Sequence, residues 1–232
     1  MTAGTAFFTA AVDALSDDEL RAASALDGWS RAHVVAHMAR NAEALTRLAN
    51  WARTGVETPM YSGPEQRNAD IEATATGSAT TLRGELVSTA ETLTAALGAL
   101  DDTTWNATLR SAQGRPMPAL EVPWMRTREV WLHTVDLGTG ATVADIPADV
   151  VDAVIADAAR TLSTKDGCVA AVLEATDRDE TWVLGSDAEP VRVRGAGADL
   201  LSWLVGRTGP VGLTATSSAG ASVEVPTPPR WL

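Results

Sequence analysis

The segment that most limits the possible folds of this chain is residues 29–55, which read WSRAHVVAHMARNAEALTRLANWARTG. Ser30 is a favourable helix N-cap and Gly55 a favourable stop, so the pattern predicts one long helix between them. Apolar residues recur within it at helical spacing and form a stripe that other helices have to cover. Much of that stripe consists of Val34, Met38, Leu45 and Leu48.

The rest of the first two-thirds of the chain supplies those other helices. Ser16 and Glu19 have capping-box spacing for a short helical turn, and Pro123 can open a longer helix. Two stretches, 56–77 and 111–123, read as irregular connections, and the first is long enough to have a functional role. We therefore expect a helical bundle with crossover connections over residues 1–163. Its further helices are predicted at 5–15, 78–100, 123–138 and 147–162.

From about residue 164 the pattern changes to short strands separated by polar turns. VAAVLEAT, ETWVLG, VRVRG, GLTATS and SVEVP read as strands, and AGADLLSWLVGRTG reads as a helix. Residues 164–232 are therefore predicted to form a small α+β domain.

Composition excludes several classes of function. The net charge of −12 argues against nucleic-acid binding, which needs clustered Lys and Arg. Cys168 is the single cysteine, so no internal disulfide or CxxC metal cage is expected. The first residues lack the basic region of a signal peptide, and no segment has the roughly 20 apolar residues needed to cross a bilayer. We expect a cytoplasmic protein that binds small molecules and neither nucleic acid nor membrane, with its oligomeric state open, a monomer included.

All three histidines of the chain lie in pairs with i, i+4 spacing, His33 with His37 and Glu129 with His133. Residues four apart on a helix project side by side, so each pair can present two ligands to one metal ion held between helices. The alternative is a hydrogen-bonded core pair without metal, and spacing alone gives the two interpretations about equal weight. Two imidazoles and a carboxylate suit zinc with an open position, or Fe(II), and spacing does not choose between them.

His33 and His37 are not equivalent candidates. With Ser30 as the N-cap, His33 falls in the first helical turn, where side chains are often solvated. His37 lies one turn deeper, beside the apolar stripe, so helix geometry favours His37 as the ligand.

Several motifs of the chain resemble those of one family. They are GWSRAHVVAHMARNA, WARTGVETPMY, PEQRNADI, AQGRPMPA, WMRTREVWLHTVDLG and the terminal VPTPPRWL. Across nearly the whole length, the chain is similar to the mycothiol-dependent maleylpyruvate isomerases, within the broader DinB-like superfamily of metal-binding four-helix bundles. The resemblance implies an α+β protein with an N-terminal DinB-like four-helix bundle and a small C-terminal α+β domain.

The same resemblance implies a site and a reaction. It implies zinc held by His37, Glu129 and His133, a catalytic role for Arg67 in PEQRN, and mycothiol as the thiol cofactor. The implied reaction is the cis–trans isomerisation of maleylpyruvate to fumarylpyruvate in gentisate degradation. Adding a thiolate to the conjugated double bond leaves a single bond that can rotate, and expelling it regenerates the thiol. A metal ion favours the thiolate, so Cys168 is not needed as a nucleophile.

Four other residues are weaker candidates for the site. Arg126 and Arg128 are assigned to a solvated helix end near Asp136, and Trp124 and Trp131 could line the pocket. Two alternative functions stay open at this point. One is a mycothiol S-transferase on the same bundle, and the other is a non-catalytic stress-response protein with a structural metal.

Overall fold

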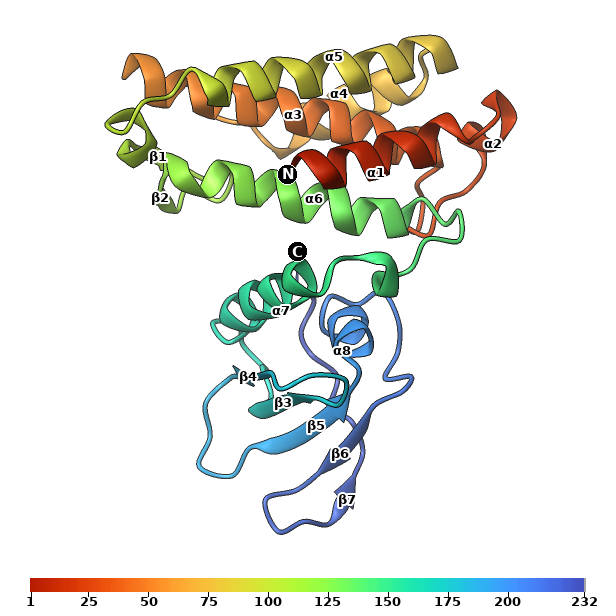
Figure 1. Ribbon diagram of the computed structural model, residues 1–232, viewed down its shortest axis with the longest axis vertical. Helices are drawn as coiled ribbons and strands as arrows, with labels where there is room; N and C mark the ends of the chain where they lie inside the picture. Colours follow the sequence, from red (N-terminus) through yellow and green to blue (C-terminus); the bar gives the residue numbers. More distant parts are fainter. Residues whose placement is uncertain (232) are drawn as a thin grey trace. The chain divides into compact units, whose positions relative to one another are not determined.

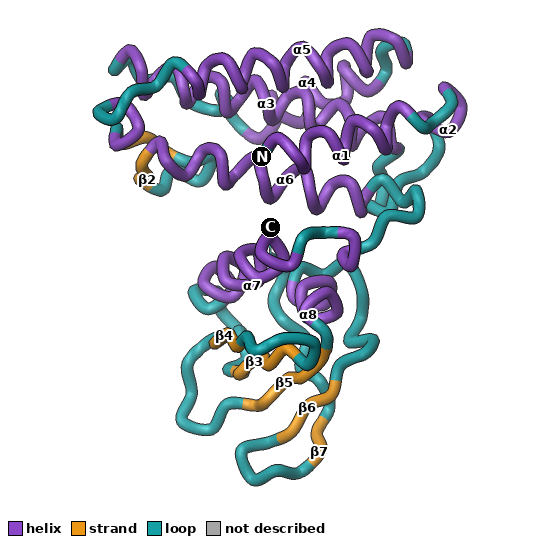
Figure 2. The backbone as a smooth tube through the Cα atoms, in the orientation of Figure 1, coloured by secondary structure: helices purple, strands orange, loops and turns teal. Residues whose placement is uncertain are grey.

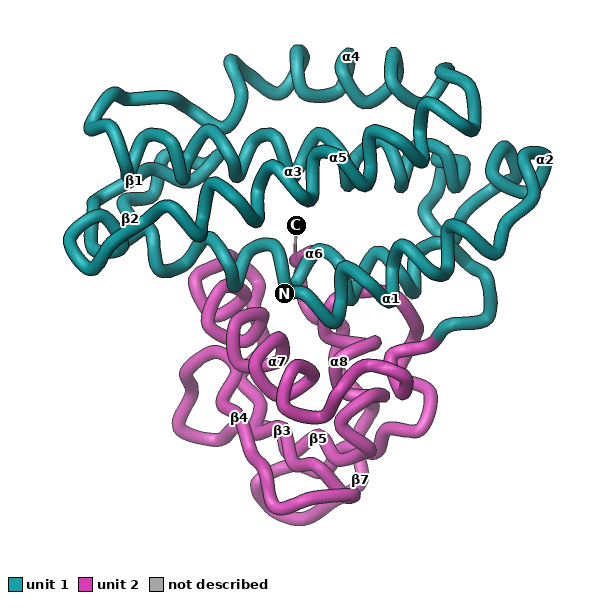
Figure 3. Tube along the Cα trace, turned by 45° about the horizontal axis from the view of Figure 1, so that its top comes forward, with its two compact units in different colours: residues 1–141 teal, residues 142–232 magenta. Residues whose placement is uncertain are grey.

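The computed structural model describes residues 1–231, which fall into two compact units, Met1–Ala141 and a second unit that begins at Thr142 (Figure 3). The first unit is helical, and the second contains a small sheet, as the sequence predicts (Figure 2). The boundary differs from the one expected after residue 163, because the helix over Ala148–Leu162 groups with the sheet and not with the bundle. No helix among residues 1–231 has the length and apolar content needed to span a membrane.

The first unit is built around four helices that form a closed ring of neighbours. Helix α3 packs against α5 and α6, and α1 packs against the same two helices from the other side (Figure 1). This arrangement confirms the predicted four-helix bundle, with the helix at the N-terminus as its fourth member. The ring consists of α1 (Thr2–Asp13), α3 (Arg31–Thr54), α5 (Ala79–Gly98) and α6 (Val122–Asp136).

The predicted ends of α3 are confirmed in detail. The Ser30 hydroxyl accepts a hydrogen bond from the backbone N–H of His33, and the His33 ring in turn accepts one from the backbone N–H of Ser30. At the other end, Gly55 takes a left-handed conformation with φ of 72°, which glycine adopts without steric cost. The capping box predicted at Ser16 and Glu19 also forms, and it starts the short helix α2 (Asp17–Arg21).

The connection predicted as irregular over residues 56–77 contains a further helix of the bundle unit. Helix α4 (Pro64–Ala75) packs against α3 and begins with proline at its first position (Figure 1). Pro64 is pre-set for that position, since its ring fixes φ near the helical value and the missing N–H would have no helical partner. The proline signal was therefore present in the sequence, but the weak apolar periodicity that follows it hid the helix.

The second connection predicted as irregular, residues 111–123, is also partly ordered. Strands β1 (Thr108–Arg110) and β2 (Pro116–Pro118) form a hairpin in which Leu109 faces Met117. Both of these side chains are buried in the apolar core that α3 and α5 share. The hairpin is thus held by burial of two residues, and it leads through a short turn into α6. Short 3-10 turns flank it, η1 (Thr104–Asn106) and η2 (Ala119–Glu121).

The second unit has five strands in the order β4-β3-β5-β6-β7. Strands β3 and β5 are parallel, and the other neighbouring pairs are antiparallel. The two helices of this unit pack against each other, with α7 beside β4 and α8 against β3 and β5. The elements are η3 (Val143–Asp145), α7 (Ala148–Leu162), β3 (Ala171–Ala175), β4 (Thr181–Leu184), β5 (Val191–Gly195), α8 (Gly197–Leu204), β6 (Thr214–Thr216) and β7 (Ser222–Val223).

Candidate metal centre

Two neighbouring helices of the bundle bring His37, Glu129 and His133 together. One carboxylate oxygen, Oε2 of Glu129, lies 3.0 Å from Nε2 of His37 and 3.2 Å from Nε2 of His133. The three ligand atoms lie within 4.8 Å of one another, close enough to bind one metal ion. His37 comes from α3, whereas Glu129 and His133 lie one turn apart on α6. The i, i+4 pair on α6 therefore shares its site with a single histidine of α3.

Burial prepares His37 to act as a neutral ligand. Its side chain is buried inside the bundle, and loss of hydration lowers its pKa to about 4, although the hydrogen bond to Glu129 opposes this shift. The ring is therefore uncharged at neutral pH, which is the form that binds a metal. In the hydrogen bonds observed here, Nε2–H donates to Glu129, and Nδ1 lies 3.3 Å from a nitrogen of Arg67.

The α6 pair carries opposite charges. Burial alone would raise the pKa of Glu129, but hydrogen bonds from His133 and His37 outweigh it and hold that pKa well below the usual value. Burial also works against a charged His133, yet the carboxylates of Asp136 and Glu129 raise its pKa to about 9. Nδ1 of His133 lies 2.8 Å from Oδ2 of Asp136. The protonated His133 ring is thus stabilised between the carboxylates of Glu129 and Asp136.

This donor set fits a zinc-type centre. Zinc binds imidazole nitrogen and carboxylate oxygen, and three protein ligands leave one position for water or substrate. Ligand histidines commonly place their second ring nitrogen against a carboxylate, which orients the ring. Asp136 stands in that relation to His133. It was not singled out from the sequence, although its position three residues after His133 puts it on the same side of α6.

His33 lies outside this group. Its Nδ1 is 2.7 Å from the Ser30 hydroxyl and its Nε2 is 3.0 Å from Oε2 of Glu72 on α4. The structure therefore places His37 with Glu129 and His133, and gives His33 a role at the start of α3.

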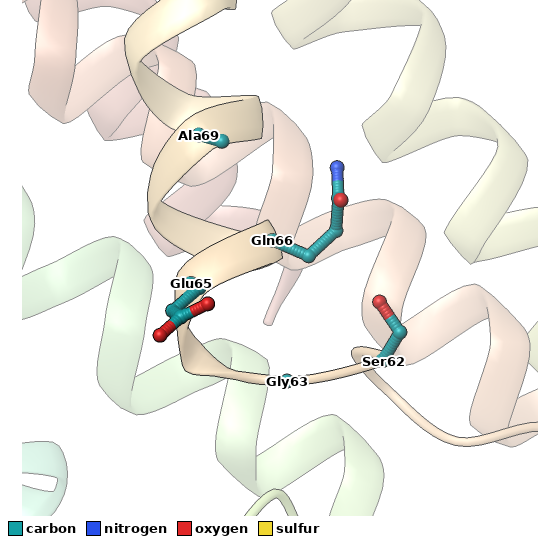
Figure 4. Close-up of a pocket in the computed structure, with 5 residues that line it drawn as sticks. All are labelled: Ser62, Gly63, Glu65, Gln66 and Ala69. Atoms are coloured by element: carbon teal, nitrogen blue, oxygen red, sulfur yellow. The ribbon is translucent and has the colours of Figure 1, made fainter.

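Arg67 reaches the centre from α4, a helix in the connection predicted as irregular. Besides its contact with His37, its guanidinium lies over the ring of Tyr61, 5.8 Å from the ring centroid. A cavity of about 330 Å³ opens at the beginning of this helix, beside Ser62, Gly63 and Gln66 (Figure 4). The start of α4 thus places the Arg67 guanidinium at the edge of the metal centre.

Two of the secondary candidates, Trp131 and Arg126, lie differently from what the sequence suggested. Trp131 is buried and packs on Phe7 of α1, with ring centroids 5.3 Å apart, so it belongs to the core. The tryptophan at the centre is instead Trp29, which precedes α3 and contacts the His37 ring edge-on at 5.7 Å. Arg126 was expected at a solvated helix end, but only 1% of its surface is exposed, because the first turns of α6 face α3.

The fold and the site define a protein built on a helical bundle with a candidate centre of two histidines and one glutamate. Comparison with family models identifies the chain more closely. Residues 1–138 match the mycothiol maleylpyruvate isomerase N-terminal domain, and residues 145–228 match the C-terminal domain of the same family. The chain belongs to the mycothiol maleylpyruvate isomerase family. The gap between the two matches contains the boundary of the two structural units.

Solved structures agree with this assignment. The chain is similar to the crystal structure of the mycothiol-dependent maleylpyruvate isomerase, with 37% identity and a TM-score of 0.88 over 99% of this chain and 93% of that one. A mutant of that enzyme with one histidine replaced by alanine is similar at 36% identity, with the same TM-score and coverage. A search of curated protein sequences gave no match.

Proposed function

We propose that this protein is a mycothiol-dependent isomerase that converts maleylpyruvate to fumarylpyruvate. The observation that carries this proposal is the three-residue centre of His37, Glu129 and His133 inside a chain that matches both domains of the family. Similarity over 99% of the chain to a solved isomerase of this kind supports it. We also propose that the protein is cytoplasmic, where a low-molecular-weight thiol is kept reduced.

We propose zinc as the metal, held by Nε2 of both histidines and by the Glu129 carboxylate. When bound, zinc and mycothiol together supply a thiolate that can add reversibly to a conjugated double bond. The residues of this chain prepare the centre for that chemistry. His37 is held neutral by burial, Glu129 is held ionised by its two histidine partners, and Asp136 orients the His133 ring.

The charged and aromatic neighbours of the centre act on the substrate. The substrate carries two carboxylates, and Arg67 can bind one of them with two parallel N–H groups. The cation also favours negative charge that develops on the substrate during addition. Trp29 contacts the His37 ring edge-on and is the aromatic neighbour of the centre. Cys168 lies on the segment before β3, in the second unit, and is not one of the three residues grouped at the centre.

The test is an assay of maleylpyruvate conversion with zinc-loaded and chelated protein, each with and without mycothiol. We expect trans product only when both metal and thiol are present, with the total concentration of free thiol unchanged. Consumption of one thiol per product would show an S-transferase instead. Absence of any conversion by loaded protein with thiol would contradict the proposal.

A further inference from the structure

A second arginine lies next to the candidate metal centre, in the interior of the bundle. Arg126 is on α6, one turn before Glu129, and Asn41 is on α3, one turn after His37. Nη1 of Arg126 donates to Oδ1 of Asn41 at 2.9 Å and to the backbone oxygen of Met38 at 2.8 Å. The Arg126–Asn41 pair and the His37–Glu129 pair therefore both join α3 to α6, one helical turn apart. The two helices lie side by side in the bundle (Figure 1).

The guanidinium of Arg126 is only half used by the protein. Both contacts are made by Nη1, whereas Nε and Nη2 are buried and have no hydrogen-bond partner among residues 1–231. Buried polar groups are nearly always hydrogen-bonded, and a buried cation usually has a paired anion. Nε–H and Nη2–H form one edge of the planar group, and such an edge matches the two oxygens of a carboxylate.

The surroundings of Arg126 place its guanidinium close to the candidate metal centre. Burial lowers its pKa to about 10, and the charges of Glu129 and Tyr61 oppose that shift, so both side chains lie within electrostatic range. Tyr61 also lies under the guanidinium of Arg67. The two arginines thus share Tyr61 as a neighbour, one at the edge of the centre and the other in its interior.

We propose that Nε–H and Nη2–H of Arg126 bind one carboxylate of a dicarboxylic substrate, while Arg67 binds the other. This inference rests on the proposed function for the identity of the substrate, and on the contacts of Arg126 for the site itself. Asn41 and Met38 hold the guanidinium so that its free edge is oriented before the ligand arrives, which reduces the entropy lost on binding.

The direct test follows the side-chain Nε–H resonance of Arg126 by nuclear magnetic resonance in the full-length, zinc-loaded protein. Its assignment comes from its loss in Arg126→Lys. Maleate, a cis-dicarboxylate, is titrated in the absence of thiol, so that no turnover occurs. We expect a saturable downfield shift, and a much weaker effect of crotonate, which has one carboxylate. Binding of maleate without movement of this resonance, or no binding of maleate, would overturn the inference.

Matched variants separate ligand binding from structural support. Arg126→Lys keeps the charge but loses the fork, so we expect the Kd for maleate to rise by about 30-fold or more with zinc still bound. Asn41→Ala removes one of the two contacts that tie Arg126 to α3, and it keeps the Met38 contact and the fork, so its Kd should stay within about threefold of the parent. Equal weakening in both variants would show that Arg126 only ties the two helices together.

The isomerase assay keeps the two proposals distinguishable. Maleate binding at Arg126 in a protein without isomerase activity would contradict the proposed function and support the carboxylate site. Full isomerase activity with an unmoved Arg126 resonance would support the proposed function and contradict the carboxylate site at Arg126.

Discussion

Nη2 of Arg67 lies 3.3 Å from Nδ1 of His37, which joins α4 to the candidate metal centre. In this arrangement Nδ1 accepts a hydrogen bond from Arg67, because Nε2–H donates to Glu129. A metal bound at Nε2 requires the ring proton to sit on Nδ1, where it can no longer accept from a guanidinium. We therefore expect metal binding to release Arg67 from His37 and leave it available for a substrate carboxylate.

Replacement of Arg67 should damage catalysis and leave the metal in place. Loss of a charge-assisted pair in a partly desolvated site should cost about 2–5 kcal/mol. This is between one and four decades in kcat/KM, at about 1.4 kcal/mol per decade. Arg67→Lys should recover part of the loss, since it keeps the charge without the planar fork. Zinc content and isomerase kinetics, measured together, check this, and near-normal kcat/KM in zinc-loaded Arg67→Ala would leave Arg67 only a tethering role.

Single replacements of the three centre residues should empty the site. His37→Ala, Glu129→Ala and His133→Ala each remove one of three ligands, so we expect most of the bound zinc to be lost in each variant. His33→Ala is the matched control, because it removes a histidine of the same helix whose contacts are with Ser30 and Glu72. Elemental analysis of the purified variants gives the answer. Loss of zinc in His33→Ala, with zinc retained in His37→Ala, would reverse the choice of ligand.

Zinc binding should release about one proton near pH 7. In the metal-free protein His133 is protonated at this pH, since its pKa is about 9, whereas His37 is neutral because its pKa is about 4. The metal has to displace the proton of His133, so its affinity should fall as the pH is lowered from about 9 toward about 4, by about tenfold per pH unit. Calorimetry in buffers of different ionisation enthalpy counts the protons.

Asp136→Asn provides the control for that count. The substitution removes one of the two carboxylates that raise the pKa of His133, so fewer protons should be released near pH 7. A count near zero in the parent protein would show that His133 is already neutral before the metal binds.

Gly4 of α1 should not tolerate a larger side chain. A Cβ at this position would lie 2.5 Å from Cγ2 of Val130 and 2.8 Å from Nε1 of Trp131, both on α6. Gly4→Ala should therefore lower the free energy of unfolding by about 1–3 kcal/mol, because a packed interface has to shift. Gly84 of α5 has no atom within 4 Å of the same test position, so Gly84→Ala should be neutral or stabilising by about 0.5–1 kcal/mol. Urea unfolding of the two variants measures the contrast, and equal stability would contradict close packing of α1 on α6.

Local signals in the sequence were enough to predict the helices that have clear ends. Ser30 and Gly55 mark α3 because a hydroxyl that caps free N–H groups, and a residue that tolerates positive φ, act within a few residues of the helix end. The i, i+4 pair of Glu129 and His133 is likewise set by helix geometry alone. The strands of the second unit and the capping box at Ser16 belong to the same class of local feature.

The spacing of residues along the chain does not show which side chains from different helices meet, and this depends on tertiary packing. Only the packing of α3 on α6 brings His37, and not His33, to Glu129, and only the packing of the first turns of α6 buries Arg126. The position of Arg67 depends on α4, whose helix is held against α3 by contacts distant in sequence. Which residues can form helices and supply ligands could be predicted from the sequence, because those properties depend on near neighbours. The meeting of these ligands in one centre, and the environment that sets their charges, came from the fold, because burial and electrostatic partners are contributed by residues far away along the chain.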